Sequence, residues 1–179
     1  MISILVAVSI AQGTTGQSKL NWNDGPTVTH KGKSKGHTYQ VTFTQENFQA
    51  HGRTLKWMKK EHGYDNLYPA IIRGKKVIFM FGMDGISTKE SVAQYLGSRF
   101  TELVGVKVVL DGKQKDIPKE LTEGLLYPNI GKDNVTITFP GKGSAMKIHM
   151  DGSDGGGGYM VDWQLSTKGH WTRKISEGD

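Results

Sequence analysis

The feature that most constrains the fold is a strict alternation of large apolar and polar residues in the last quarter of the chain. Three segments show it, and glycine-rich turns separate them. The apolar positions form three rows: Val135, Ile137 and Phe139; Met146, Ile148 and Met150; and Tyr159, Val161, Trp163 and Leu165. Successive side chains point to opposite faces of a strand, so each row marks one buried strand face. With a fourth strand over 171–175, these segments predict an antiparallel four-strand meander.

The expected register of the meander pairs large residues with large residues, because a sheet with one buried face must keep its apolar side chains together. In the first hairpin, Ile137 then lies opposite Ile148. In the second hairpin, Met150 lies opposite Tyr159. Both pairings place every large apolar residue of the meander on a single face.

Upstream segments predict further strands at 39–43, 54–58, 70–72, 77–81 and 106–110. A capping box from Ser87 to Glu90 predicts a helix that Gly97 ends. Pro118 is placed to start a single helical turn. The predicted fold class is α+β and β-rich: an antiparallel sheet or sandwich with a C-terminal four-strand meander and one or two short helices.

Polar side chains occupy the other face of the meander. In the expected register, Lys147 lies opposite Asp162, and His149 lies diagonal to it, so a pair between His149 and Asp162 is geometrically feasible. An exposed cross-strand ion pair adds little stability and is common on solvated faces. We expect such a solvated face, and we keep His149 and Asp162 as candidate ligand-binding residues.

The glycine-rich turn between the second and third rows contains Asp151, Ser153 and Asp154. Carboxylates and hydroxyls are ligands of calcium, so these three residues are a candidate metal site. Counted from Asp151, a glycine is sixth and Asp162 is twelfth, which is a partial match to a calcium loop. The default interpretation is a hairpin loop whose aspartates bind nearby backbone N–H groups, with no cofactor.

A second acidic turn, Asp84-Gly85, follows the apolar segment 77–81. It resembles Asp154-Gly155, which also follows a strand. If the two turns were neighbours at one end of a sheet, their carboxylates would form a candidate site for metal-assisted hydrolysis. The alternative is that Asp84 only forms a turn.

Composition excludes several classes of site. The chain has no cysteine, which rules out thiolate zinc, disulfides and a cysteine nucleophile. It contains neither a G-x-S-x-G nor an H-E-x-x-H motif. The 24 glycines are typical of many tight turns. The formal charge of +6 is spread along the chain, which favours a basic, soluble surface over a dedicated nucleic-acid arm.

The N-terminal segment indicates export. An apolar run over 2–8 precedes Ser9-Ile10-Ala11, which predicts a signal peptide cut before Gln12. The run is too short for a transmembrane span, and a buried first strand is the alternative. Residues 12–36 are polar and are interpreted as a flexible linker, including the small basic patch 31–35. The single β-rich domain is expected over 37–179.

Nucleic-acid binding is a further alternative, because two tryptophans stand beside cations. Trp57 lies among Lys56, Lys59 and Lys60, and Trp171 precedes Arg173 and Lys174. A stacking aromatic beside cations suits single-stranded nucleic acid. The same pattern is typical of an edge strand, where lysine discourages edge-to-edge pairing.

Two stretches, Phe81-Gly82-Met83-Asp84-Gly85 and residues 150–163, resemble segments of small exported bacterial proteins of β-rich character. The resemblance covers residues 77–175. That group has no assigned activity, so the resemblance implies a β-rich fold and a secreted or periplasmic location, and it adds no catalytic residues.

The absence of a catalytic signature favours a protein that is not an enzyme. The leading hypothesis is a non-enzymatic extracytoplasmic binding or structural module, whose partner is an unidentified ligand or protein. A metal-assisted hydrolase that uses the acidic loops around Asp84 and Asp154 is the first alternative. A nucleic-acid-binding domain is the second.

Overall fold

The structure is a computed structural model. It describes residues 6–7, 25–48, 54–59, 67–83, 100–141, 145–153 and 157–177. Its strands are β1 (Val6–Ala7), β2 (Thr27–Ser34), β3 (His37–Asn47), β4 (Thr54–Lys59), β5 (Leu67–Arg73), β6 (Lys76–Phe79), β7 (Thr101–Leu110), β8 (Lys113–Gln114), β9 (Val135–Thr138), β10 (Met146–Gly152), β11 (Tyr159–Leu165) and β12 (Trp171–Glu177). One 3-10 turn, η1 (Lys119–Leu121), is the helical element of the described residues.

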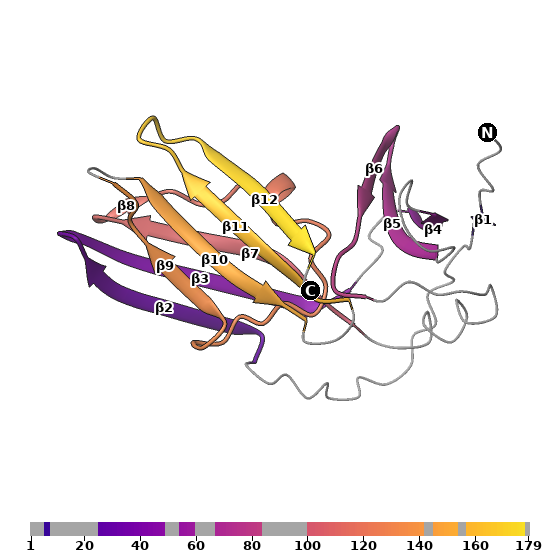
Figure 1. The fold of residues 1–179 in the computed structure, drawn as a ribbon, viewed down its shortest axis with the longest axis horizontal. Helices are drawn as coiled ribbons and strands as arrows, with labels where there is room; N and C mark the ends of the chain where they lie inside the picture. The colour runs from indigo at the N-terminus through magenta and orange to yellow at the C-terminus, as the bar shows by residue number, and fades with distance from the viewer. Residues whose placement is uncertain are drawn as a thin grey trace.

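The strands form three antiparallel sheets (Figure 1). The β3 sheet has the order β2-β3-β7-β8, and the β10 sheet has the order β12-β11-β10-β9. A small sheet, β1-β4-β5-β6, stands beside them. The β10 sheet is the predicted meander, and its first hairpin pairs Ile137 with Ile148 as expected. The β-rich fold class is therefore confirmed.

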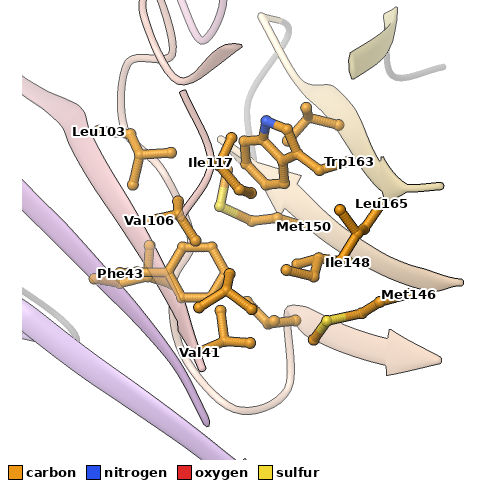
Figure 2. Close-up of a cluster of buried hydrophobic side chains, with 14 of the residues drawn as sticks. Val41, Phe43, Leu103, Val106, Ile117, Met146, Ile148, Met150, Trp163 and Leu165 are labelled. Carbon is orange, nitrogen blue, oxygen red and sulfur yellow. The ribbon is translucent and has the colours of Figure 1, made fainter. Parts of the chain in front are cut away.

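The two larger sheets pack face to face and enclose the main core. The side chains that fill it and are at most 2% exposed include Val41 and Phe43 of β3, Val106 and Val108 of β7, Met146, Ile148 and Met150 of β10, and Val161 and Trp163 of β11. Figure 2 shows Phe43 and Ile148 pointing into the space between the sheets. Each large apolar side chain buried in this way contributes about 1.5–3 kcal/mol. The apolar side chains of the alternating segments thus contribute much of the stability of the sandwich.

The polar segment before residue 37 is part of this sandwich, so the linker expected over 12–36 is wrong for its last part. β2 pairs with β3 along its whole length, from Thr27 opposite Thr44 to Ser34 opposite His37. Val28 is the one large apolar side chain that β2 packs against the core. Because backbone pairing rather than side-chain burial holds β2, its sequence resembles that of a linker. The sandwich begins at Thr27 rather than at residue 37.

The N-terminal apolar run contains a short paired segment. Val6 lies opposite Trp57 and Ala7 lies opposite Lys56, so β1 adds to the edge of the small sheet. This pairing agrees with the alternative of a first strand for these two residues. The signal peptide over 1–11 stays a prediction.

The segment after η1 joins the sandwich to the small sheet. Leu125 and Leu126 are both fully buried, but Leu125 belongs to the sandwich core and Leu126 to the core of the small sheet. The backbone of Phe81 holds this segment from one side, since its N–H donates to Gly124 O at 2.8 Å and its carbonyl accepts from Leu126 N at 2.9 Å. Adjacent residues of one extended segment thereby face two different cores.

Some predicted features fall outside the described residues. These are Asp84, Asp154 and the helix expected from Ser87 to Gly97. The helical turn expected at Pro118 is described and is η1, with Pro118 immediately before it. No helix in the described ranges is long and apolar enough to cross a membrane.

Candidate functional site

The pairing of β10 with β11 decides which polar side chains meet. Gly152 lies opposite Tyr159, and Met150 lies opposite Val161. The expected pairing of Met150 with Tyr159 is therefore wrong by two residues. A slip of two residues keeps every side chain on its face, which is why the apolar pattern does not reveal it.

The tyrosine explains the observed register. Its ring lies over Gly152, where an added Cβ would be 2.0 Å from Tyr159 Cζ. Tyr159 is only 2% exposed, and its hydroxyl donates to Leu126 O at 3.1 Å. An aromatic side chain that covers a cross-strand glycine replaces the apolar contact that glycine lacks. Because Gly152 has no side chain, the Tyr159 ring fits over it, in the position from which the hydroxyl reaches Leu126 O.

This register brings the outward polar residues of β10 and β11 into direct contact. His149 lies opposite Asp162. Its Nδ1 is 2.7 Å from Asp162 Oδ1, and Lys147 Nζ is 3.0 Å from Asp162 Oδ2. Lys147, which the expected register placed opposite Asp162, faces Gln164 and reaches Asp162 diagonally. Both carboxylate oxygens of Asp162 therefore have a partner on β10.

His149 extends the contact to a second carboxylate. Its Nε2 lies 3.1 Å from Asp151 Oδ1. Carboxylate oxygens only accept, so both ring contacts are hydrogen bonds when the imidazole carries a proton on each nitrogen. The four side chains Asp151, His149, Asp162 and Lys147 then form a line of alternating charge, which we call the Asp–His–Asp–Lys row. With a protonated imidazole, the row has no net charge.

Asp162 is the electrostatic centre of the row. Partial burial raises the pKa of Asp162, but hydrogen bonds and positive charge from His149 and Lys147 outweigh it and hold the pKa below its ordinary value. The side chain is 30% exposed, so solvent screens these interactions. On the outer strand, Lys174 lies opposite Asp162 in the register. Asp162 therefore stays ionised in the folded protein at neutral pH.

The hydrogen bonds of the row engage the groups of His149 and Asp162 that acid–base chemistry would use. A general base needs a free nitrogen or oxygen within hydrogen-bond reach of a reacting proton. Both ring nitrogens of His149 and both oxygens of Asp162 are already bonded to neighbours. The geometry supports mutual neutralisation across two strands.

The candidate calcium residues are only partly described. Asp151 is bound to His149, and its backbone N–H donates to Asn134 O at 3.0 Å. Ser153 has a positive φ of 55°, and its N–H donates to Tyr127 O at 3.0 Å. Asp154 lies outside the described residues, as does Asp84. Within the described ranges, no three His, Asp or Glu side chains converge as metal ligands. The calcium site and the convergence of the two acidic loops therefore remain predictions.

The two tryptophans of the nucleic-acid hypothesis differ in burial. Trp57 is 1% exposed and belongs to the core of the small sheet. Trp171 packs against the sandwich core, and its indole N–H donates to Lys115 O at 2.8 Å. Beside it, Arg173 is turned toward the junction and donates to Glu123 O at 2.8 Å. Trp57 therefore offers no open aromatic face for base stacking, whereas Trp171 is partly exposed, and nucleic-acid binding stays a prediction.

Sequence reasoning missed an ion pair at the junction of the sandwich and the small sheet. Arg73 of β5 donates to Glu123 Oε1 at 2.5 Å, and the Glu123 side chain is only 3% exposed. Burial lowers the pKa of Arg173, and the negative charge of Glu123 partly offsets this effect. These residues lie far apart in the chain and share no local pattern, so only the fold brings them together.

Sequence reasoning also missed a basic face on the sandwich. The outward side of the β3 sheet carries Lys31 and Lys33 of β2 and Lys107 of β7, all exposed. None of them forms an ion pair with any described residue. We call this surface the lysine face. The sequence shows part of this face as the basic patch 31–35. Because that patch is interpreted as a linker, nothing indicates that it belongs to the same sheet as Lys107.

Comparison with protein-family models, with curated proteins and with solved structures found no match.

Proposed function

We propose that this chain is a non-enzymatic binding or structural module that works outside the cytoplasm. The observation that supports it is the Asp–His–Asp–Lys row, in which the candidate catalytic groups use their donors and acceptors on one another. A β-sandwich whose outer polar side chains bond to one another in this way is suited to presenting a fixed surface to partners. Export is proposed from the apolar run over 2–8 and the small residues that follow it.

The first test is for turnover. Purified protein is incubated with chromogenic esters, phosphoesters and glycosides, with and without magnesium, calcium or zinc. We expect no product above that formed by the heat-denatured protein. Turnover that Asp84→Asn or Asp154→Asn abolishes, while the variant melts like the parent, would establish the hydrolase alternative instead. Gln164→Asn, an exposed change in the same sheet, is the matched control.

The second test is for export. The full chain is produced in a bacterial host with an intact secretion system, and the N-terminus of secreted material is sequenced. Processing before Gln12 supports the proposal. Protein that stays in the cytoplasm and still carries Val6 and Ala7 would refute it and would favour β1 as a permanent strand.

A further inference from the structure

The lysine face differs from the opposite outer face of the sandwich in how its charges are arranged. On the β10 sheet, Lys147 and His149 are paired with Asp162 and Asp151. On the β3 sheet, the three lysines have no acidic partner among the described residues. The β10 face thus pairs Lys147 and His149 with carboxylates, although Lys174 of β12 has no ion pair with a described residue, whereas none of the three lysines of the β3 face has such a partner.

The lysines are held in a fixed pattern by strand pairing. Lys31 lies opposite Gln40, Lys33 lies opposite Thr38, and Lys107 lies opposite Thr42. Lys31 and Lys33 are two residues apart on one strand, which separates their backbones by about 7 Å. Lys107 is two strands away, at about 10 Å across the sheet. The charges therefore spread over a surface that matches an extended anionic partner better than a single small anion.

The acidic groups of the same sheet are not paired with these lysines. Asp111, which follows β7, accepts from Thr38 N at 2.9 Å, opposite Lys33, and binds His37 Nδ1 at 2.7 Å. Glu46 follows the β-bulge of β3, four residues beyond Thr42, or about 13 Å along the strand. Asp116, beside β8, accepts from Val108 N at 2.9 Å and from Gln114 Nε2. None of these carboxylates is paired with a lysine of the face.

Between the lysines the surface carries hydroxyl and amide groups. They belong to Thr29, Thr38, Gln40 and Thr42, and the pair Thr27 and Thr44 follows beyond Lys107 in the register. The hydroxyls of Thr29 and Thr42 are 3.0 Å apart across β2 and β3, so at least one hydroxyl proton is shared within the face. Hydroxyl and amide groups both donate and accept, which is the capacity needed to bind sugar hydroxyls.

The face has no exposed large apolar or aromatic side chain that could enter a membrane or stack on single-stranded bases. A membrane surface is held partly by apolar side chains that enter it, and single-stranded nucleic acid by stacking aromatics. The exposed large apolar side chains of the described residues are Val77, Tyr127 and Met160, and they lie on other elements. Positive charge together with hydroxyls, with the half-buried Val109 as an apolar neighbour, fits a carbohydrate polymer with carboxylate groups.

We infer that the lysine face binds an acidic polysaccharide. Lys31, Lys33 and Lys107 contact carboxylates of the polymer, and the threonines and Gln40 contact its hydroxyls. This inference rests on the proposed binding function. It adds which surface of the protein binds and which class of ligand is bound.

The test measures binding of the full chain to polygalacturonate by biolayer interferometry at low and high salt. We expect binding that weakens as salt rises, because exposed charge pairs are screened. The triple variant Lys31→Gln/Lys33→Gln/Lys107→Gln should bind roughly tenfold more weakly, since each exposed ion pair contributes a factor of about 1.4 to 5. The same three positions changed to arginine should retain binding, because the charge is kept.

A matched control separates the site from net charge. Lys119→Gln/Lys132→Gln/Lys168→Gln removes the same charge from exposed positions outside the β3 sheet, and it should bind like the parent. Equal weakening by the two glutamine triples would overturn the inference. Melting curves and gel filtration of each variant verify folding, and the arginine triple keeps the test decisive if the glutamine triple aggregates.

Three further arms assign the ligand class. Neutral dextran should not bind. Vesicles of phosphatidylglycerol or a mixed oligonucleotide that bound through the lysine face, while polygalacturonate did not, would overturn the polysaccharide assignment. Failure of every polymer to bind would also overturn it, although the proposed module function would stand. Shortening of the polymer, detected as new reducing ends, would instead refute the non-enzymatic function.

Discussion

Replacing Gly152 with alanine tests whether Tyr159 sets the register of β10 and β11. The new Cβ would lie 2.0 Å from Cζ and 2.4 Å from both Cε atoms of the Tyr159 ring. Such contacts force the ring to move. The ring is 2% exposed and its hydroxyl binds Leu126 O, so it cannot move without losing burial and that hydrogen bond.

The expected magnitude follows from these two losses. Overpacking a well-packed core costs about 1–3 kcal/mol. A lost hydrogen bond costs about 0.5–1.5 kcal/mol. We therefore expect Gly152→Ala to lower the free energy of unfolding by about 1.5–4.5 kcal/mol. Tyr159→Phe, which removes only the hydroxyl, should lower it by the second amount alone.

Gly105 in β7 provides the control, because a Cβ there meets no heavy atom within 4 Å. Gly105→Ala should be neutral or should stabilise the fold by up to about 1 kcal/mol, because alanine reduces the freedom of the unfolded chain. Urea unfolding followed by far-UV circular dichroism measures all three variants. A Gly152→Ala variant within about 0.5 kcal/mol of Gly105→Ala would refute the reasoning.

Three further predictions concern charge. The folded pKa of Asp162 lies below its ordinary value of 3.8, so its stabilisation is present above that pH and is lost as pH falls through the folded pKa. Asp162→Asn should therefore lower the free energy of unfolding by under about 1 kcal/mol at pH 7. Urea titrations should show that this difference between the variant and the parent becomes smaller in acid. A difference that grew in acid would contradict the lowered pKa of Asp162. Arg73→Gln should cost about 1–3 kcal/mol in the same assay, because it leaves the Glu123 carboxylate buried without that cation, and an unchanged unfolding midpoint would contradict the ion pair. Millimolar calcium should leave the melting temperature unchanged, since His149 binds the carboxylates of Asp151 and Asp162, whereas a rise that chelator reverses would establish the metal site.

The sequence predicted the buried faces of the meander because alternation depends only on burial. It could not predict the register of β10 and β11, since a two-residue slip leaves the faces unchanged. Gly152 carries no side chain, so it was counted as part of the loop, although it pairs with Tyr159. The contact between His149 and Asp162 was predicted as diagonal and is direct. The residues of this part of the candidate site were found, and their geometry required the structure.

Other parts of the fold were hidden because their stability is not local. β2 has one large apolar residue against the core, and its hydrogen bonds to β3 hold it in place. Its edge position is supported by His30, whose Nε2 lies 2.9 Å from Ile130 O in the loop before β9. Because a linker and a polar edge strand share the same composition, only the pairing partner distinguishes them. The lysine face could not be predicted either, because it depends on the pairing of β2 with β3.

The most direct test of the account is a disulfide across β10 and β11. Directly opposite residues of antiparallel strands have Cα atoms about 4.5–5.5 Å apart, which suits a disulfide. A diagonal pair is about 8 Å apart and does not. The chain has no cysteine of its own, so thiol counts are unambiguous. After mild oxidation, His149→Cys/Asp162→Cys should lose both thiols, and Lys147→Cys/Asp162→Cys should keep them. The reverse result would show that Lys147 faces Asp162, and it would contradict the Asp–His–Asp–Lys row on which the proposed function rests.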